Sequence, residues 1–356
     1  MSSSPSIREV ARFAKVSVAT ISRVLNGKGA IRESTRTHVL AAIAELGYVP
    51  HSAARSLSTR RTLSLGVVLP DLHGEFFSEL IRGIDLAARR TGYHILVSGS
   101  HSKSAEANAV LAALHGRVDG LIVMSPVQQP ADAKAAKAAR PSIPPGVPVV
   151  MLNAADETSL HDSIRIDNRG GARALVEHLL YLGHRRIAMI SGPEGNLDAA
   201  ERMLGYREAL AARDVPFVEE WVLAGDFREE SGFRAGQRIL ELESRPTAIF
   251  AANDAMAIGC FAAVRERGLE VPGDISIAGF DDVPMSRYLS PGLTSVRVAI
   301  AELGARAVER LLIAVDAVGE RPRHHEVVAA TLVPRGSTAP PGGPTQSTAT
   351  PRRNSR

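Results

Sequence analysis

The segment IREVARFAKVSVATISRVLN, residues 7–26, decides the fold of the N-terminal part of the chain. Apolar residues recur at helical spacing from Ile7 to Ala14 and, after a break, from Ile21 to Leu25. The intervening residues 15–17 are too few for a strand but sufficient for a tight turn, and Ser17 is placed to cap the second helix. The pattern predicts a helix-turn-helix.

The beginning of the second helix has the composition of a helix that reads DNA. Val18 and Ala19 lie off the apolar face, where water offers them no partner but thymine methyl groups would. Thr20, Ser22 and Arg23 add hydrogen-bond donors at the end that enters the major groove. The alternative is a plain helical hairpin in another fold. The residues predicted to contact the major groove and its phosphates are Ser17, Val18, Ala19, Thr20, Ser22, Arg23, Asn26 and Arg36.

The charge distribution favours a phosphate partner for the same region. The chain has 356 residues, of which 45% are apolar, enough for two or three domains with real cores. Its net charge of +4 is uneven, because residues 1–61 carry +7 and the remainder −3. Binding to DNA phosphates explains positive charge concentrated on one small unit better than a general need for solubility does.

Neither a signal peptide nor a membrane-spanning run is apparent, so we expect a cytoplasmic, nucleoid-associated protein without a membrane partner. Cys260 lies in the apolar run AMAIGCFAAV, and a buried small side chain is favoured over a catalytic nucleophile. The eleven histidines lack metal-binding spacing, and solvated side chains are favoured for His324 and His325. We expect neither a metal site nor a resident cofactor.

A third helix is predicted from about Glu33 to Leu46, capped by Gly47, and a short segment, SAARSL, follows at residues 52–57. This segment is too short to be a stable helix alone. An exposed leucine at position 57 is unexpected in a linker, and one explanation is that Leu57 covers the core of the next domain.

The order of these motifs resembles the lac-repressor type (LacI/GalR family) of transcriptional regulators: IREVARFAKVSVATISRVLNG, a third helix ending in ELGYVP, and SAARSL. The resemblance implies that SAARSL is a hinge helix that folds on operator DNA, with a leucine wedged into the minor groove. Leu57 matches that leucine, and Ala54 and Arg55 complete the predicted hinge contacts. His51 and Arg32 depart from the family's usual Asn and Ser, which puts the capping of the hinge and third helix in doubt.

From Thr62 to about Pro334 short apolar runs alternate with helical segments, which predicts parallel sheets flanked by helices. The runs end in polar or turn residues. The predicted strands lie in residues 63–71, 94–100, 120–126, 148–154, 186–193, 248–254 and 275–282. Helices are expected in 76–89, 171–181, 203–212 and 255–265.

Ligands of parallel sheets bind beyond the carboxyl ends of the strands, which here include Asp71, Ser100, Asn153, Asp226 and the pair Asp281-Asp282. Carboxylates, amides and an aromatic face at Phe227 suit a polyhydroxylated ligand. Capping of the following helix is the alternative role for Asp198, Asp254 and Ser100.

The resemblance extends to about Arg335 and implies a core similar to periplasmic sugar-binding proteins, with two lobes and an effector in the cleft between them. The motifs RIAMISGP, GDFREESGFRAG, PTAIFAANDAMAIG and DISIAGFDDVP carry it. Together with Asn153, the predicted effector-binding residues are Phe77, Asn196, Asp198, Arg202, Phe227, Asn253 and Asp281. Asp167, at the crossing between lobes, is a weaker candidate. Asn196 stands where purine-responsive members have Arg, which favours a sugar.

The resulting domain boundaries are a helix-turn-helix headpiece at 1–50, a hinge and linker at 51–61 and an effector domain at 62–336. We expect lobe 1 to comprise about 62–166 and 298–324, and lobe 2 about 167–297 and 325–336. The tail, 337–356, is rich in Pro, Gly, Ser and Thr and is expected to be disordered. It lacks the leucine heptad of tetrameric members, so the resemblance implies a homodimer.

The sequence therefore predicts a repressor that binds a near-palindromic double-stranded operator as a dimer, with affinity modulated by a small-molecule effector. The effector is expected to be a sugar, with a nucleoside or a protein co-effector as alternatives. A solute-binding protein would need an export signal and would not use residues 7–57. A sugar-processing enzyme is disfavoured because the carboxylates are not paired as a general acid and base.

Overall fold

The computed structural model describes residues 5–26, 31–48, 61–101, 103–124, 142–153, 160–319 and 321–342. The chain divides into two compact units, Met1–Leu63 and Ser64–Arg356. The predicted hinge residues Ala54, Arg55 and Leu57 lie outside the described residues.

The first unit, the headpiece, consists of three helices: α1 (Ile7–Phe13), α2 (Val18–Asn26) and α3 (Glu33–Glu45). The predicted helix-turn-helix is confirmed. Ser17 caps α2, because its Oγ accepts a hydrogen bond from the Thr20 amide at 3.1 Å. The turn before it passes through Lys15, whose φ of 50° lies in the left-handed region.

The headpiece has a small apolar core to which all three helices contribute. Gly47, with φ of +59°, ends α3 and turns the chain so that Tyr48 joins this core. At the other end of α3, the Arg32 side chain makes no capping hydrogen bond, as the sequence suggested. The buried residues of the core are Val10, Ala11, Ala14, Ile21, Val24, Val39, Ala42 and Tyr48.

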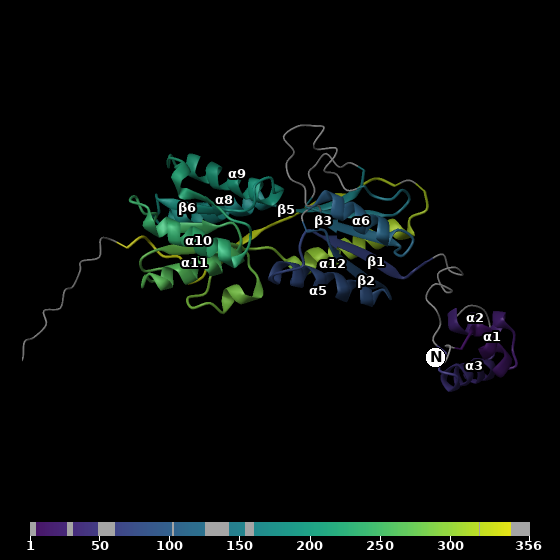
Figure 1. Ribbon diagram of the computed structural model, residues 1–356. Helices are drawn as coiled ribbons and strands as arrows, with labels where there is room; N and C mark the ends of the chain where they lie inside the picture. Colours follow the sequence, from purple (N-terminus) through teal and green to yellow (C-terminus); the bar gives the residue numbers. More distant parts are fainter. Residues whose placement is uncertain are drawn as a thin grey trace, which may run out of the picture. The chain divides into compact units, whose positions relative to one another are not determined.

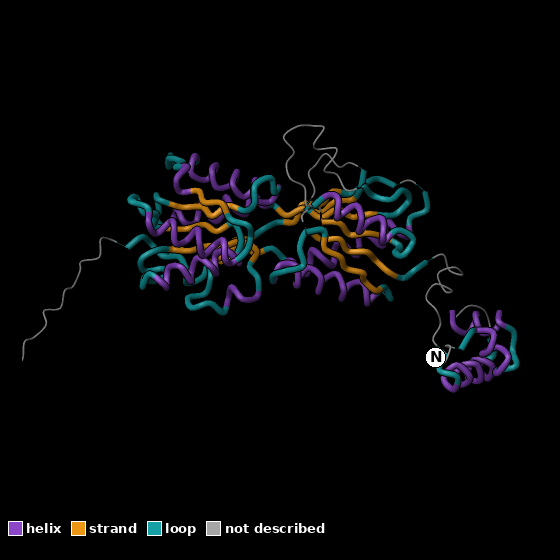
Figure 2. Tube along the Cα trace, viewed as in Figure 1, coloured by secondary structure: helices purple, strands orange, loops and turns teal. Residues whose placement is uncertain are grey.

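The second unit contains two six-stranded sheets, one in each lobe (Figures 1 and 2). In the first sheet the order is β11-β5-β4-β3-β1-β2, and every strand is parallel to its neighbours. Its strands are β1 (Ser64–Leu69), β2 (His94–Gly99), β3 (Gly120–Met124), β4 (Val149–Leu152), β5 (Asp162–Ile166) and β11 (His325–Val328).

The second sheet has the order β12-β10-β9-β8-β6-β7 and is parallel except for β12, which pairs antiparallel with β10. Its strands are β6 (Ile187–Ser191), β7 (Val222–Ala224), β8 (Ala248–Ala251), β9 (Ser276–Asp281), β10 (Thr294–Arg297) and β12 (Thr331–Val333). Each of the seven apolar runs singled out in the sequence contains one strand of these two sheets.

Helices cover both faces of each sheet. In the first lobe, α5 (Glu75–Arg90) and α12 (Ile300–Asp316) pack on one face, and α6 (Ser104–Leu114) covers the other (Figure 1). In the second lobe, α8 (Asn168–Tyr181) pairs with α9 (Leu197–Ala211), and α10 (Glu229–Glu241) pairs with α11 (Asp254–Glu266). Two short 3₁₀ helices, η1 (Glu219–Trp221) and η2 (Pro284–Arg287), complete the second lobe.

The chain crosses between the lobes three times. The first crossing joins β5 to α8 at Asp167, and the second joins β10 to α12. The third lies between β11, in the first sheet, and β12, in the second. The prediction that residues 325–336 belong entirely to lobe 2 was therefore wrong: residues 325–328 complete the first sheet, because β11 pairs with β5.

The prediction of disorder from residue 337 onward was also wrong for residues 337–342, which we call the C-terminal strap. Ser337 is fully buried, and its Oγ donates to the Ile277 carbonyl at 2.6 Å. The Ala339 amide donates to Ser276 Oγ at 3.1 Å. Hydroxyl and backbone groups, rather than apolar side chains, anchor this segment, which is why its composition was misleading. The predicted disorder of residues 343–356 falls outside the described residues.

Candidate functional site

The predicted DNA-contacting residues of α2 lie on the side of the helix opposite its core. Ile21 and Val24 are buried, whereas Ala19 and Arg23 are exposed and Val18 is 41% exposed. The exposed side chains of α2 therefore lie on the face that points away from the core of the headpiece. The other predicted residues are Ser17 and Arg36, which are exposed, Thr20 and Ser22, which are half-buried, and Asn26, the last residue of α2.

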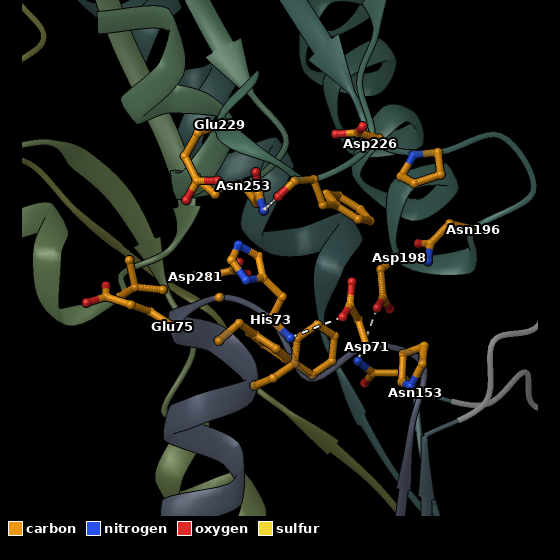
Figure 3. Close-up of a pocket in the computed structure, with 18 of the residues that line it drawn as sticks. Asp71, His73, Glu75, Asn153, Asn196, Asp198, Asp226, Glu229, Asn253 and Asp281 are labelled. Atoms are coloured by element: carbon orange, nitrogen blue, oxygen red, sulfur yellow. Dashed lines mark hydrogen bonds between the residues drawn. The ribbon is translucent and has the colours of Figure 1, made fainter. Parts of the chain in front are cut away.

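The second candidate site is a cavity of about 480 Å³ between the two lobes, within the usual size of a small-ligand site. Its walls come from the carboxyl ends of strands in both sheets and from the loops that follow them (Figure 3). All eight residues predicted to bind an effector line it: Phe77, Asn153, Asn196, Asp198, Arg202, Phe227, Asn253 and Asp281.

Asn196 and Asn253 are positioned by capping the helices that begin at the cavity. Asn196 Oδ1 accepts from the Ala199 amide and Asn253 Oδ1 from the Met256 amide, both at 2.9 Å. Asn253 Nδ2 donates to the Phe227 carbonyl at 2.9 Å, which ties two walls of the cavity together. Asp167, the weaker candidate, caps α8 by accepting from the Gly170 amide at 2.8 Å.

The capping role considered for Asp198 and Asp254 was therefore wrong, since Asn196 and Asn253 cap α9 and α11. It was wrong for Ser100 as well, whose hydroxyl donates to the Leu69 carbonyl at 3.2 Å. Asp254 is fully buried behind the cavity, where its carboxyl accepts from the Val283 amide at 2.9 Å and from the Ser295 hydroxyl at 2.6 Å. Burial, with the nearby charge of Asp281, raises the pKa of Asp254 to about 8. Its role is structural, because it ties the loop after β9 to α11.

Arg202 is the central cation of the cavity and is held in a fixed position. It is only 4% exposed, and its guanidinium lies 3.8 Å from the centre of the Phe280 ring. Its Nε donates to Asn168 Oδ1 at 2.8 Å, and its Nη1 donates to the Ala252 carbonyl. Its Nη2 donates to Asp281 Oδ1 at 3.3 Å, so every nitrogen of the guanidinium has a protein acceptor.

Asp198 connects the two lobes at the floor of the cavity. Its Oδ2 accepts from Asn153 Nδ2, in the first lobe, at 3.2 Å. Its Oδ1 accepts from Asn168 Nδ2, at the start of α8, at 2.8 Å. Burial raises the pKa of Asp198 above its usual value, against the lowering effects of Arg202 and the two amides.

Two further contacts join the lobes at the mouth of the cavity. Arg228 of the second lobe forms an ion pair with Asp71 of the first, with 3.0 Å between Nη2 and Oδ2. Glu75 Oε2 accepts from the Met285 amide at 3.0 Å. Asp71, Glu75 and Met285 line the cavity, so both contacts join the lobes at its edge.

Several lining residues were not among the predicted site residues. His73, Glu75 and Phe76 follow β1, Glu229 begins α10, and Met285 lies in η2. The rule that ligands lie beyond strand ends points to the loop after β1, but it does not say which side chains of the following turn face inward.

The backbone conformation of three lining residues supports the interpretation of this cavity as a binding site. Asn153, Phe227 and Asp281 all have positive φ, at 48°, 69° and 106°. Such conformations cost energy for residues other than glycine and gather at binding sites, where the surrounding structure enforces them.

The described residues contain no group of His, Cys, Asp and Glu suited to a metal ion. No helix in the described part of the chain is long and apolar enough to cross a membrane. Cys260 is buried, as predicted.

Comparisons with known proteins match both parts of the chain that contain the candidate sites. The family model "Bacterial regulatory proteins, lacI family" matches residues 6–51, and the model "Periplasmic binding protein-like domain" matches residues 176–338. The chain is 36% identical to the HTH-type transcriptional repressor PurR of Pectobacterium carotovorum over 94% of this chain and 96% of the relative. It is 32% identical to the ribose operon repressor of Haemophilus influenzae over 86% of this chain and 90% of that one.

Among solved structures, the lac repressor dimer bound to operator and the anti-inducer ONPF superposes with a TM-score of 0.83 at 32% identity. It covers 95% of this chain and 100% of that one. A complex of the regulator CelR with cellobiose has a TM-score of 0.68 at 29% identity and covers 94% and 99%. The chain belongs to the lacI family: it is a DNA-binding transcriptional regulator with a periplasmic-binding-protein-like effector domain, not an enzyme.

Proposed function

We propose that the chain is a repressor that binds a near-palindromic operator as a homodimer, with its affinity for DNA set by a sugar in the cavity between the lobes. The observation that carries the proposal is that eight polar and aromatic residues line one cavity that spans two lobes. Ligand in this cavity changes the angle between the lobes, and hence the separation of the two hinges. Coupling of this kind is typically about 1 to 3 kcal/mol.

The lining supports a sugar. Carboxylates and amides accept and donate to vicinal hydroxyl groups, and the Phe77 and Phe227 rings provide apolar walls for the faces of a sugar ring. Two relatives, the ribose operon repressor and the CelR-cellobiose complex, are named for sugars. A nucleoside or a protein co-effector is the alternative, and the identity of the occupant distinguishes them.

An exposed apolar surface of the first lobe supports the homodimer. β2 is the edge strand of its sheet, and Leu96 and Val97 on it are exposed, as are Leu72 and Leu86 nearby. A monomer would leave these side chains in water, and a second copy would cover them. With the operator as target, the protein works in the cytoplasm, on the nucleoid.

The experiment that tests the proposal selects operator fragments from genomic DNA with the purified chain and measures Kd with and without sugars. We expect Arg23→Ala to weaken operator binding by about 1 to 3 kcal/mol, because an exposed arginine on α2 would lose its contact with a base. Arg213→Ala, a change to a surface arginine of the second lobe, is the control and should leave Kd unchanged. An Arg23→Ala protein with normal affinity would remove Arg23 from the DNA-contacting set.

Leu57→Ala tests the predicted hinge contact. If Leu57 wedges into the minor groove, the substitution should abolish preference for operator over random DNA while effector binding stays normal. Fluorescence anisotropy with matched operator and scrambled duplexes measures the preference. Wild-type operator affinity in this variant would show that Leu57 has another role, such as covering the core of the effector domain.

A further inference from the structure

Acidic side chains far outnumber basic ones in the lining of the cavity between the lobes (Figure 3). Among the described lining residues Arg202 is the one arginine, no lysine occurs, and His73 is the one histidine. The carboxylates are Asp71, Glu75, Glu194, Asp198, Asp226, Glu229 and Asp281.

The carboxylates at the mouth of the cavity are either exposed or already hydrogen-bonded within the protein. Glu194, Asp226 and Glu229 are exposed, so water and salt screen their charges. Asp71 is paired with Arg228, and Glu75 accepts from the Met285 amide. These contacts leave the inner carboxylates, Asp198 and Asp281, as the ones whose charge a ligand would meet without much screening.

Of the two inner carboxylates, Asp281 is the one that is hydrogen-bonded to Arg202. Arg202 donates to Asp281 at 3.3 Å and directs its other nitrogens to Asn168 and Ala252. Asp281 is 4% exposed, and Arg202 is the one donor to its carboxylate within the part of the chain that the structure describes. Asp198 has amide partners, which are neutral. The inner cavity therefore has an excess of carboxylates over cations, two against one among the residues that line it, and burial raises the pKa of both carboxyl groups.

The titration behaviour of these groups agrees with that excess. Burial raises the pKa of Asp281 to about 6, Arg202 opposes the rise, and the charge of Asp198 adds to it. Asp254 lies behind them and is itself perturbed by Asp281. At neutral pH the Asp281 carboxylate is still mostly ionised, so a buried charge persists that a cation would stabilise.

We propose that the effector is a sugar bearing a protonated amine, whose ammonium group is bound by Asp281 and Asp198. This inference rests on the proposed function and deepens it. An ammonium donates up to three hydrogen bonds to carboxylates and restores charge balance in the inner cavity. We expect sugar phosphates and sugar acids to bind poorly, because the Arg202 guanidinium already donates to three protein acceptors and the carboxylates of Asp198 and Asp281 would repel an anion.

Sugars of the same ring configuration that differ in the charge of one substituent test the inference. Glucose, galactose and mannose are compared with their 2-amino forms, with the neutral N-acetylated amines and with the corresponding uronic acids, by thermal shift and calorimetry at pH 7.5. We expect at least one amine to bind about tenfold more tightly than its hydroxyl and N-acetyl counterparts, since a charged hydrogen bond is gained. The uronic acids should not bind.

The outcomes separate this inference from the proposed function. Neutral sugars that bind as tightly as amines would overturn the inference and uphold the sugar sensor. Binding of a uronic acid would also overturn the inference and uphold the sugar sensor. Failure of every compound to bind would contradict both, while operator binding, measured separately, would be unaffected.

Asp281→Asn removes the charge and keeps the shape of the side chain, so it should abolish the preference for the amine over the neutral sugar. Asp198→Asn is the second variant, which serves if Asp281→Asn does not fold. Glu243→Gln removes an exposed carboxylate outside the cavity and should keep the wild-type preference. A preference that survives in both aspartate variants would refute the assigned role of these carboxylates.

Discussion

Asp281→Ala is expected to abolish the response to effector while leaving operator binding intact. Asp281 lies at the end of β9, is almost completely buried and is one of the acceptors that hold Arg202 in place. Its loss removes a charged hydrogen-bond acceptor for the ligand and frees one arginine nitrogen, each worth about 1.5 to 3 kcal/mol. Effector affinity should therefore fall by about a hundredfold or more.

The measurement is a dose-response curve of operator binding against effector, with calorimetry for the direct affinity. Glu220→Ala, which removes an exposed carboxylate of the second lobe, is the matched control and should give the wild-type curve. The headpiece does not include position 281, so the operator Kd without effector should match wild type in both variants. A normal dose response in Asp281→Ala would place the effector site elsewhere.

Gly259→Ala is expected to destabilise the effector domain strongly. Gly259 lies within α11 where α10 packs against it, and an added Cβ would be 1.9 Å from the Glu229 carbonyl oxygen. Gly232 on α10 makes the reciprocal approach, with 2.1 Å to the Met256 carbonyl oxygen. Backbone atoms cannot move aside as the end of a flexible side chain can, so the two helices must separate. We expect this to lower the free energy of unfolding by about 3 kcal/mol.

Chemical denaturation followed by circular dichroism measures this loss. Gly273→Ala is the control, since its added Cβ would be 3.6 Å from the Glu270 Cβ, an ordinary contact, and the free energy of unfolding should change by about 0.5 kcal/mol or less. Because Asn253, which lines the cavity, caps α11, separation of the helices should also weaken effector binding. Wild-type stability in Gly259→Ala would mean that α10 and α11 lie farther apart than described.

Much of the fold was predictable because its determinants are local. Helical spacing and the cap at Ser17 define the headpiece, and apolar runs followed by polar residues define seven strands. Ligands of parallel sheets bind at the carboxyl ends of the strands, and this rule was sufficient to predict that Asn153 and Asp281 line one cavity, although they are far apart in sequence. The resemblance to the lacI family supplied Phe77.

The remaining features depend on partners that are distant in sequence. Asp254 looks like a helix cap until its hydrogen bonds to residues near 283 and 295 are known. The C-terminal strap is polar and was mistaken for disorder, because its anchors are backbone and hydroxyl groups of the second sheet. β11 is a half-exposed edge strand with too few apolar residues to reveal which sheet it joins.

The three crossings between lobes have a consequence for synthesis of the protein. The first sheet cannot acquire its edge strand until residue 328 has left the ribosome, although four of its six strands have emerged by residue 152. The headpiece, by contrast, has its whole core by Tyr48 and can fold early. A nascent chain can therefore present a folded helix-turn-helix long before the domain that senses effector is complete. Premature termination would accordingly release fragments that retain a DNA-binding unit but have no means of responding to the effector.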